Sequence, residues 1–183
     1  MTTILRRISC LALGLLLVGI GTAAFAQDAK SAALAKELTK LMDAKKLTTL
    51  AARDAAEPEA YVAVMYFSGS QMLVVGAKYA PAELMNAKLL RREYQDAYID
   101  LNSAGKPGTK VFIEDGAADG LKPDHEQNRA ADSIEQGGKT TKFDFDWKKE
   151  QKISDADYQK MLDDADKLYS RLLTALIVEA RKQ

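Results

Sequence analysis

Apolar residues recur with helical spacing near the beginning of the chain. In the segment AKSAALAKELTKLMDAKK (29–46) they occupy Leu34, Leu38, Leu41 and Met42, and lysines fill positions between them. This i, i+4, i+7, i+8 spacing places the four side chains on one face of an α-helix. We therefore predict an amphipathic helix here, with its apolar face buried against the rest of the protein.

A longer stripe of the same kind runs through the end of the chain. Its members are Tyr158, Met161, Leu162, Ala165, Leu168, Tyr169, Leu172, Leu173, Leu176 and Ile177. Ser154 and Asp157 precede the stripe. Their separation of three residues is typical of a capping pair that opens a helix. We predict a long C-terminal helix, whose stripe must be covered either by a sheet or by a second copy of the chain in a homodimer.

The middle of the chain carries strand-like runs. YVAVMYF (61–67) and MLVVGAKY (72–79) are rich in β-branched and aromatic residues and are joined by Ser68-Gly69-Ser70-Gln71. Such runs favour an antiparallel hairpin, and we expect Gly69 to take a positive φ in its turn. Because both runs are apolar at almost every position, they predict central strands that are covered on both faces.

The segments on either side of this hairpin are less regular. Residues 47–54 fit two interpretations, an extension of the first helix or the first strand of a sheet. After the hairpin, Pro81 suits the first turn of a helix, and Glu83 lies near the positive N-terminal end of that helix. Together they predict a helix over 81–94. Apolar residues within the next two runs then predict strands at 94–102 and 109–115.

The region before the C-terminal helix gives weaker signals. Residues 116–142 are polar and carry glycines without apolar periodicity, which predicts a long loop with room for a short helix near 128–134. Phe143, Phe145 and Trp147 then alternate with aspartates. This alternation favours an edge strand or an extended arm, and an aromatic platform for a ligand is the alternative.

The first 26 residues have the three parts of an export signal. Two arginines give a positive start, an apolar stretch follows, and Ala24-Phe25-Ala26 forms a small-x-small cleavage site before Gln27. The apolar stretch is shorter than the roughly 20 residues of a spanning helix. We therefore expect residues 1–26 to be removed as a signal peptide, and residues 27–183 to form a single α+β domain, periplasmic or secreted, without a membrane span.

Composition narrows the chemistry of the mature chain. It retains 24 basic and 26 acidic side chains, for a net charge of −2. We expect no nucleic-acid partner, because such a partner requires a clustered basic face. Cys10, the only cysteine, leaves with the signal, and His125 is the only histidine. The mature chain therefore has no thiol, no disulfide, and too few imidazoles for a histidine-based zinc site.

An acidic stretch from Asp115 to Glu126 partly matches the spacing of a calcium-binding loop, with Gly120 at the sharp turn. Ala117 stands at an expected ligand position, however, and a predicted strand rather than a helix precedes the loop. We therefore interpret the stretch as a solvated acidic loop and predict no metal site.

The order of the expected elements carries a resemblance to a known family. Strands at 47–54, 61–68 and 71–79, a short helix, and strands at 94–102 and 109–115 resemble the FMN-binding split barrel of the pyridoxamine-5′-phosphate-oxidase-like superfamily, over residues 47–115. The resemblance implies an antiparallel split-barrel-like sheet with flanking helices. It also implies a site for flavin mononucleotide (FMN) at the end of the third strand, with Lys78 near the phosphate and Tyr79 beside a ring.

Two functions follow from these observations. The first is a non-catalytic exported domain that binds a small-molecule ligand or an envelope protein. The second, implied by the resemblance, is an FMN-dependent oxidoreductase or flavin-binding protein. Lys78 is followed by Ala80, Pro81 and Ala82, which offer few donors to a phosphate. We therefore favour the first function.

We predict that the chain is made as a precursor and cleaved before Gln27. The intact mass of the protein recovered from the cell envelope or the medium should equal that of residues 27–183. Recovery of a product that keeps residues 1–26 would contradict this assignment.

Overall fold

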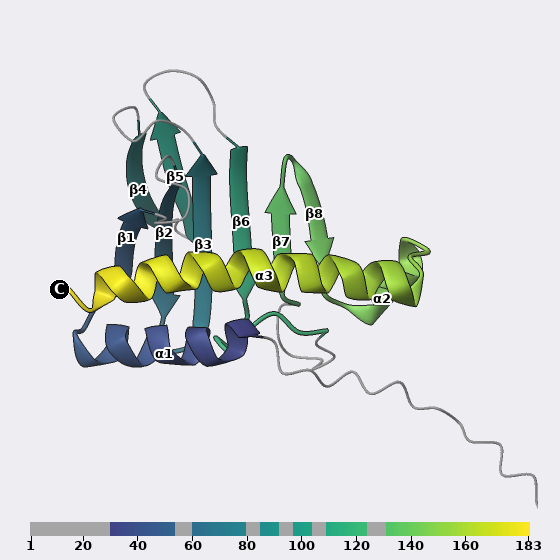
Figure 1. The fold of residues 1–183 in the computed structure, drawn as a ribbon, viewed down its shortest axis with the longest axis horizontal. Helices are drawn as coiled ribbons and strands as arrows, with labels where there is room; N and C mark the ends of the chain where they lie inside the picture. Colours follow the sequence, from purple (N-terminus) through teal and green to yellow (C-terminus); the bar gives the residue numbers. More distant parts are fainter. Residues whose placement is uncertain (1–29, 54–59, 80–84, 92–96, 104–108, 124–130) are drawn as a thin grey trace, which may run out of the picture.

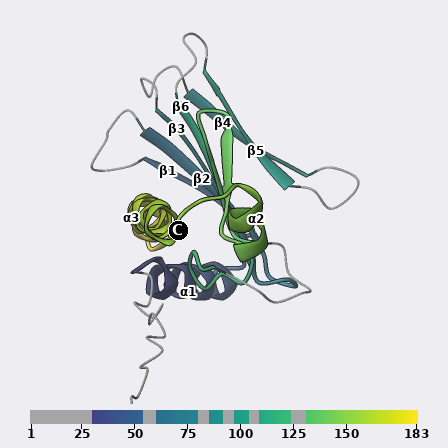
Figure 2. The same ribbon diagram turned by 90° about the vertical axis from the view of Figure 1, so that its right-hand side faces the viewer.

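A computed structural model describes residues 30–53, 60–79, 85–91, 97–103, 109–123 and 131–183 (Figure 1). The elements are α1 (Lys30–Ala44), β1 (Thr49–Arg53), β2 (Ala60–Phe67), β3 (Met72–Tyr79), β4 (Met85–Arg91), β5 (Ala97–Ser103), β6 (Thr109–Asp115), β7 (Ser133–Gln136), β8 (Lys139–Lys142), α2 (Phe145–Glu150) and α3 (Asp155–Ala180). α1 and α3 lie on one face of a sheet, and the β4–β5 pair lies on the other (Figure 2).

The main sheet has six antiparallel strands in the order β1-β2-β3-β6-β7-β8. This confirms the predicted α+β class with its long C-terminal helix. The sheet is open, with β1 and β8 as its outer strands, and it does not close into a barrel. The run at 47–54, which fitted either a helix or a strand, forms β1 and pairs with β2 in the register Ala51↔Ala63.

The predicted hairpin is formed by β2 and β3, with Val64 opposite Val75. Its strands are buried on both faces, as expected, because side chains of alternate residues enter two separate apolar clusters. The turn differs from the prediction at one position. Gln71 rather than Gly69 takes the positive φ, of 54°, and its side-chain amide donates to the Ser68 carbonyl at 2.7 Å.

The helix predicted over 81–94 is wrong for the residues that the structure describes there. Residues 85–91 form β4, which pairs with β5 and contacts β2 on the sheet face opposite the helices (Figure 2). The run MNAKLLR alternates apolar Met85, Ala87 and Leu89 with polar Asn86 and Lys88, so it fits the period of a strand as well as that of a helix. Hydrogen-bonded pairing with β5 stabilises the strand in preference to the helix.

The long loop predicted at 116–142 is also wrong in its second half. Residues 133–136 and 139–142 form the β7–β8 hairpin, which extends the sheet beyond β6. Gly137 and Gly138 supply its turn with φ values of 59° and 77°. Two consecutive positive φ values match the right-handed twist of the flanking strands, and glycine reaches them without strain. The helix expected near 128–134 does not form in the described residues 131–134.

The aromatic run after this hairpin begins a short helix instead of an edge strand or an extended arm. The Asp144 carboxylate accepts from the N–H groups of Asp146 and Trp147 and thereby opens α2. Phe143 and Phe145 contact the Tyr158 ring, with centroids 6.3 Å and 6.1 Å apart. The aromatic side chains thus pack on the core, and they do not form an exposed platform.

The C-terminal helix α3 is the central element of the core. Ser154 caps it by accepting from the Asp157 N–H, as predicted. The apolar stripe is buried against α1, β1 and β2. α3 in turn caps α1, because the Asp166 carboxylate accepts from the N–H groups of Lys30 and Ser31 at 3.2 Å and 3.1 Å. These are first-turn donors that have no partner within α1.

Contacts within one chain therefore bury the stripe of α3, and a homodimer is not required to cover it. Within the residues that the structure describes, none of the helices combines the length and the apolar composition needed to cross a membrane.

We predict that Leu172→Ala lowers the free energy of unfolding by about 2–5 kcal/mol, because Leu172 is fully buried and alanine leaves a cavity. Leu168 is only partly buried, so Leu168→Ala should cost less. Lys167 is exposed, and Lys167→Ala should change stability by less than about 0.5 kcal/mol. Urea unfolding of the mature protein measures all three. Nearly equal midpoints would contradict this packing, and midpoints that rise with protein concentration would indicate a homodimer.

Candidate functional site

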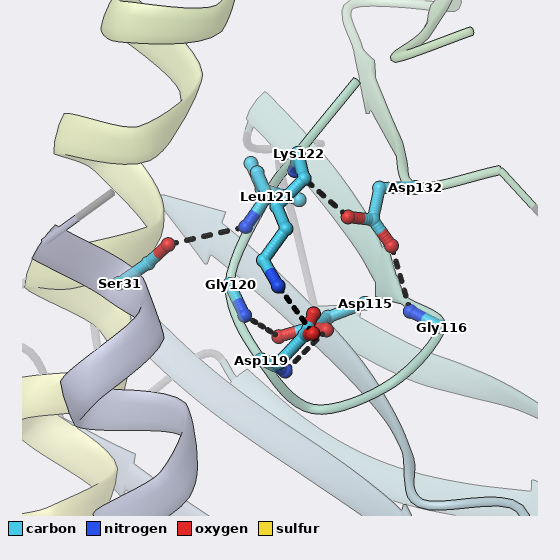
Figure 3. A network of polar contacts seen from close by, with 8 residues as sticks. All are labelled: Ser31, Asp115, Gly116, Asp119, Gly120, Leu121, Lys122 and Asp132. Carbon is cyan, nitrogen blue, oxygen red and sulfur yellow. Dashed lines mark hydrogen bonds and ion pairs between the residues drawn. The ribbon is translucent and has the colours of Figure 1, made fainter. Parts of the chain in front are cut away.

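The acidic stretch after β6 folds around the carboxylate of Asp115 (Figure 3). This side chain is fully buried. It accepts from the N–H groups of Asp119 and Gly120, both at 3.0 Å, and from the Tyr169 hydroxyl of α3 at 3.0 Å. Burial raises the pKa of Tyr169, and the charge of Asp115 raises it further. The tyrosine therefore stays protonated and acts as the donor.

A second buried carboxylate holds the other side of this loop. Asp132 accepts from the N–H groups of Gly116 and Lys122, at 2.8 Å and 2.9 Å (Figure 3). Burial raises its pKa to about 7. The hydrogen bond from Gly116 opposes this rise, and the charge of Asp115 adds to it. The pKa of Asp115 is also raised by burial, against the hydrogen bonds that it accepts from the loop.

The loop is docked tightly on the first turn of α1. Leu121 donates its N–H to the Ser31 hydroxyl at 3.2 Å, and the Leu121 side chain is buried in the core. Gly120 has a φ of 86°, and a Cβ atom there would lie 2.5 Å from the Ala32 nitrogen. The prediction of a sharp turn at Gly120 is thus confirmed, and glycine is required both by the turn and by the close approach of α1.

The interpretation of this stretch as a solvated acidic loop is wrong at Asp115, whose carboxylate is buried and engaged by backbone donors. The Asp119 side chain is partly exposed and pairs with Lys122, and Asp124 and Glu126 lie outside the described residues. In the part of the chain that the structure describes, no three histidine, cysteine, aspartate or glutamate side chains come together as ligands for a metal ion. The described part of the loop thus connects β6 to α1 and α3.

The residues that the flavin resemblance singled out lie at the end of β3. Lys78 pairs with Tyr61 of β2 and with Lys110 of β6, and Tyr79 pairs with Ala60 and Thr109. The side chains of Lys78 and Tyr79 lie outside the described part of the structure, as does His125. The assignment of Lys78 and Tyr79 to a cofactor therefore stays a prediction.

A different feature has the geometry of a ligand site. It is a groove of about 670 Å³ between α3 and the outer strand β1, which we call the α3–β1 groove. Its lining residues are Lys30, Ala51, Ala52, Arg53, Tyr61, Lys167, Ser170, Arg171, Thr174, Ala175, Val178, Glu179 and Lys182. α3 crosses the sheet beside β1 (Figure 1), and residues of these two elements supply most of the lining.

The charge of the α3–β1 groove is unlike that of the whole chain. Five of its lining side chains are basic and one, Glu179, is acidic. Glu179 forms an ion pair with Lys182, with the carboxylate and ammonium groups 2.9 Å apart, so the two charges cancel. The remaining basic residues come from the start of α1, the end of β1 and the middle of α3. Together they make a positive groove on a protein whose overall charge is near zero.

The groove also contains a buried polar group. Ser170 is 4% exposed, and its hydroxyl has no hydrogen-bond partner among the described residues. Burying a hydroxyl without a partner is unfavourable, so such a group is a candidate to bond with a ligand. Apolar side chains complete the site, from Ala52 on the sheet and from Ala175 and Val178 on α3, whereas the Ala51 and Tyr61 side chains pack on the opposite face of the sheet. Among the described residues, Val178 is the one large apolar side chain that is exposed, at 49%.

The α3–β1 groove is not apparent from the sequence. Its members lie between residues 30 and 182, and only the packing of α3 against α1 and β1 brings them together. One local signal was present. Lys167, Arg171 and Thr174 follow one another at helical spacing on the face opposite the apolar stripe, and a solvated face gives the same pattern.

We predict that the buried Asp132 makes the protein less stable as the pH rises from about 4 to about 7. In this range the unfolded state releases the Asp132 proton while the folded state, with its raised pKa, keeps it. The free energy of unfolding should fall by up to about 4 kcal/mol from this group and level off above pH 7. Asp132→Asn should remove this slope.

Urea unfolding of wild-type and variant proteins at intervals of pH measures the difference between them. Asp164→Asn is a suitable control, because the hydrogen bond from Lys160 lowers the pKa of Asp164. The titration of Asp164 therefore changes stability below the range of pH 4 to 7. The control should run parallel to the wild type between pH 4 and 7. Parallel curves for Asp132→Asn would show that Asp132 is ionised in the folded state throughout.

Comparison of the chain with models of protein families, with curated proteins and with solved structures finds no match in any of the three.

Proposed function

We propose that the protein is an exported, non-catalytic binding domain that holds an anionic ligand in the α3–β1 groove. The observation that carries this proposal is the charge of the groove, with five basic lining residues and one acidic residue on a mature chain of net charge −2. Surface charges of opposite sign are normally interspersed, so a local excess of one sign beside apolar walls marks a site that attracts the opposite charge. An anion is the ligand that fits.

The size of the groove favours a small molecule over a protein surface. Ligand sites typically occupy about 300–1,000 Å³ and combine apolar walls with a few polar groups. The α3–β1 groove, at about 670 Å³, has both features. The export signal would deliver the protein to the periplasm or the medium, where such a ligand would be met. An envelope protein with an acidic segment is the alternative occupant.

The lining residues favour binding over catalysis. A serine nucleophile needs a base within hydrogen-bond reach, and the Ser170 hydroxyl has no partner among the described residues. Glu179, the only acidic residue among the described lining residues, forms an ion pair with Lys182. Among these described residues, the lining holds neither a paired nucleophile and base nor a pair of carboxylates. We therefore propose a carrier or sensor of an anion.

We predict that binding of an anion depends on Lys167, which is exposed and lines the groove. The mature protein should be titrated with decanoate, decyl phosphate, FMN and a glutamate-rich peptide, with thermal unfolding as the readout. At least one probe should raise the midpoint of the wild type, because a ligand that binds only the folded state stabilises it. Lys167→Glu should abolish most of that rise, by placing a negative charge in the groove.

Lys40→Glu is the matched control for this charge reversal. Lys40 is exposed on α1 and is not part of the groove lining, so the variant should respond to the probes as the wild type does. If no probe shifts the midpoint, or if the shift survives in Lys167→Glu, the groove is not an anion site. A shift seen with FMN alone, and lost in Lys78→Ala, would favour the flavin alternative.

A further inference from the structure

We infer that the ligand of the α3–β1 groove is a single-chain amphiphile with one anionic head group, of which an alkyl carboxylate is the simplest example. This inference rests on the proposed function and specifies its ligand. It is carried by the unequal distribution of polar and apolar groups along the groove, which separates an end suited to an anion from a wall suited to a hydrocarbon chain.

The head group belongs beside Ser170. Lys167 precedes this residue by one helical turn, Arg171 follows it directly, and Lys30 reaches the same end from the start of α1. The nearby Asp166 carboxylate is already engaged by the N–H groups of Lys30 and Ser31. A carboxylate here would therefore meet the Lys30 and Lys167 ammonium groups, and it would accept the hydrogen bond that the buried Ser170 hydroxyl can donate.

The chain belongs along the apolar wall that begins one turn further on. Ala175 and Val178 continue the α3 side, and Ala52 faces them from the sheet. From Ser170 to Val178 the helix rises about 12 Å, which gives a chain of moderate length a continuous surface. Covering the exposed Val178 would remove apolar area from water and would favour binding.

The far end of the groove argues against a second anionic group. Glu179 lies there with Lys182, and their pairing neutralises one of the cations on that side. Arg53 is exposed at the end of β1 and is the remaining cation on that side. An acidic peptide would place charges along Ala175 and Val178, and it would leave the apolar wall without a partner. A single head with one chain matches the whole lining.

The test compares three probes on the mature protein by titration calorimetry, below the concentrations at which micelles form. Decanoate carries both head and chain, acetate carries the head alone, and decanol carries the chain alone. Decanoate should bind at least tenfold more tightly than either of the others. Equal affinity for acetate and decanoate would overturn the amphiphile while leaving the groove as an anion site.

Two variants separate the head from the chain. Ser170→Ala should weaken decanoate binding by about tenfold or more, because a hydrogen bond to a charged group is lost. It should leave the stability of the free protein unchanged or raised, since the hydroxyl has no partner there. Val178→Asp should weaken decanoate by a larger factor, because it places a negative charge on the chain wall. Lys40→Glu should change neither value.

Other outcomes would overturn the inference in distinct ways. Decanol binding as tightly as decanoate, with no effect of Ser170→Ala, would make the groove an apolar site and would contradict the proposed anion binding as well. A glutamate-rich peptide that binds through Lys167 while decanoate does not would keep the anion site and replace the amphiphile. Sedimentation with anionic phosphatidylglycerol vesicles, lost in Lys167→Glu, would assign the surface to a membrane instead of a free ligand.

Discussion

The fold depends on one buried carboxylate, that of Asp115. It lies at the end of β6, and it accepts hydrogen bonds from its own loop and from Tyr169 of α3. Since the same loop donates to Ser31 of α1, a single acidic side chain joins the sheet to both helices. A carboxylate can occupy the core only when donors surround it, so the loop geometry and the position of α3 constrain each other.

This connection explains why α3 can present two different faces. Tyr169 and Leu172 fix the inner face against the sheet, and the residues between them, Ser170 and Arg171, line the α3–β1 groove. Because the inner face cannot slide or rotate without breaking the buried hydrogen bond, the outer face is held at a fixed distance from β1. The groove is therefore formed before any ligand arrives, which reduces the entropic cost of binding.

Sequence patterns predicted the parts of the fold in which apolar residues keep one unambiguous spacing over many positions. The stripe of α3 and the paired runs of β2 and β3 are of this kind. The pattern failed at β4, because the apolar spacing there fits a helix as well as a strand, and pairing with β5 favours the strand. It failed again at β7 and β8, because these four-residue strands are stabilised by pairing with neighbouring strands. α2 was missed because the Asp144 cap was hidden in an alternation of aromatic and acidic residues.

The site was harder to predict than the fold, for a physical reason. Its charge is a property of packing: Lys30, Arg53 and Lys167 are ordinary surface residues in sequence, and they converge only because α1, β1 and α3 meet at the edge of the sheet. The acidic stretch drew attention instead, since local spacing makes it resemble a ligand loop. Within it, the buried Asp115 carboxylate accepts hydrogen bonds from backbone donors of its own loop and from Tyr169. The part of this chain with the most visible motif thus connects β6 to α1 and α3, and the part without a motif lines the α3–β1 groove.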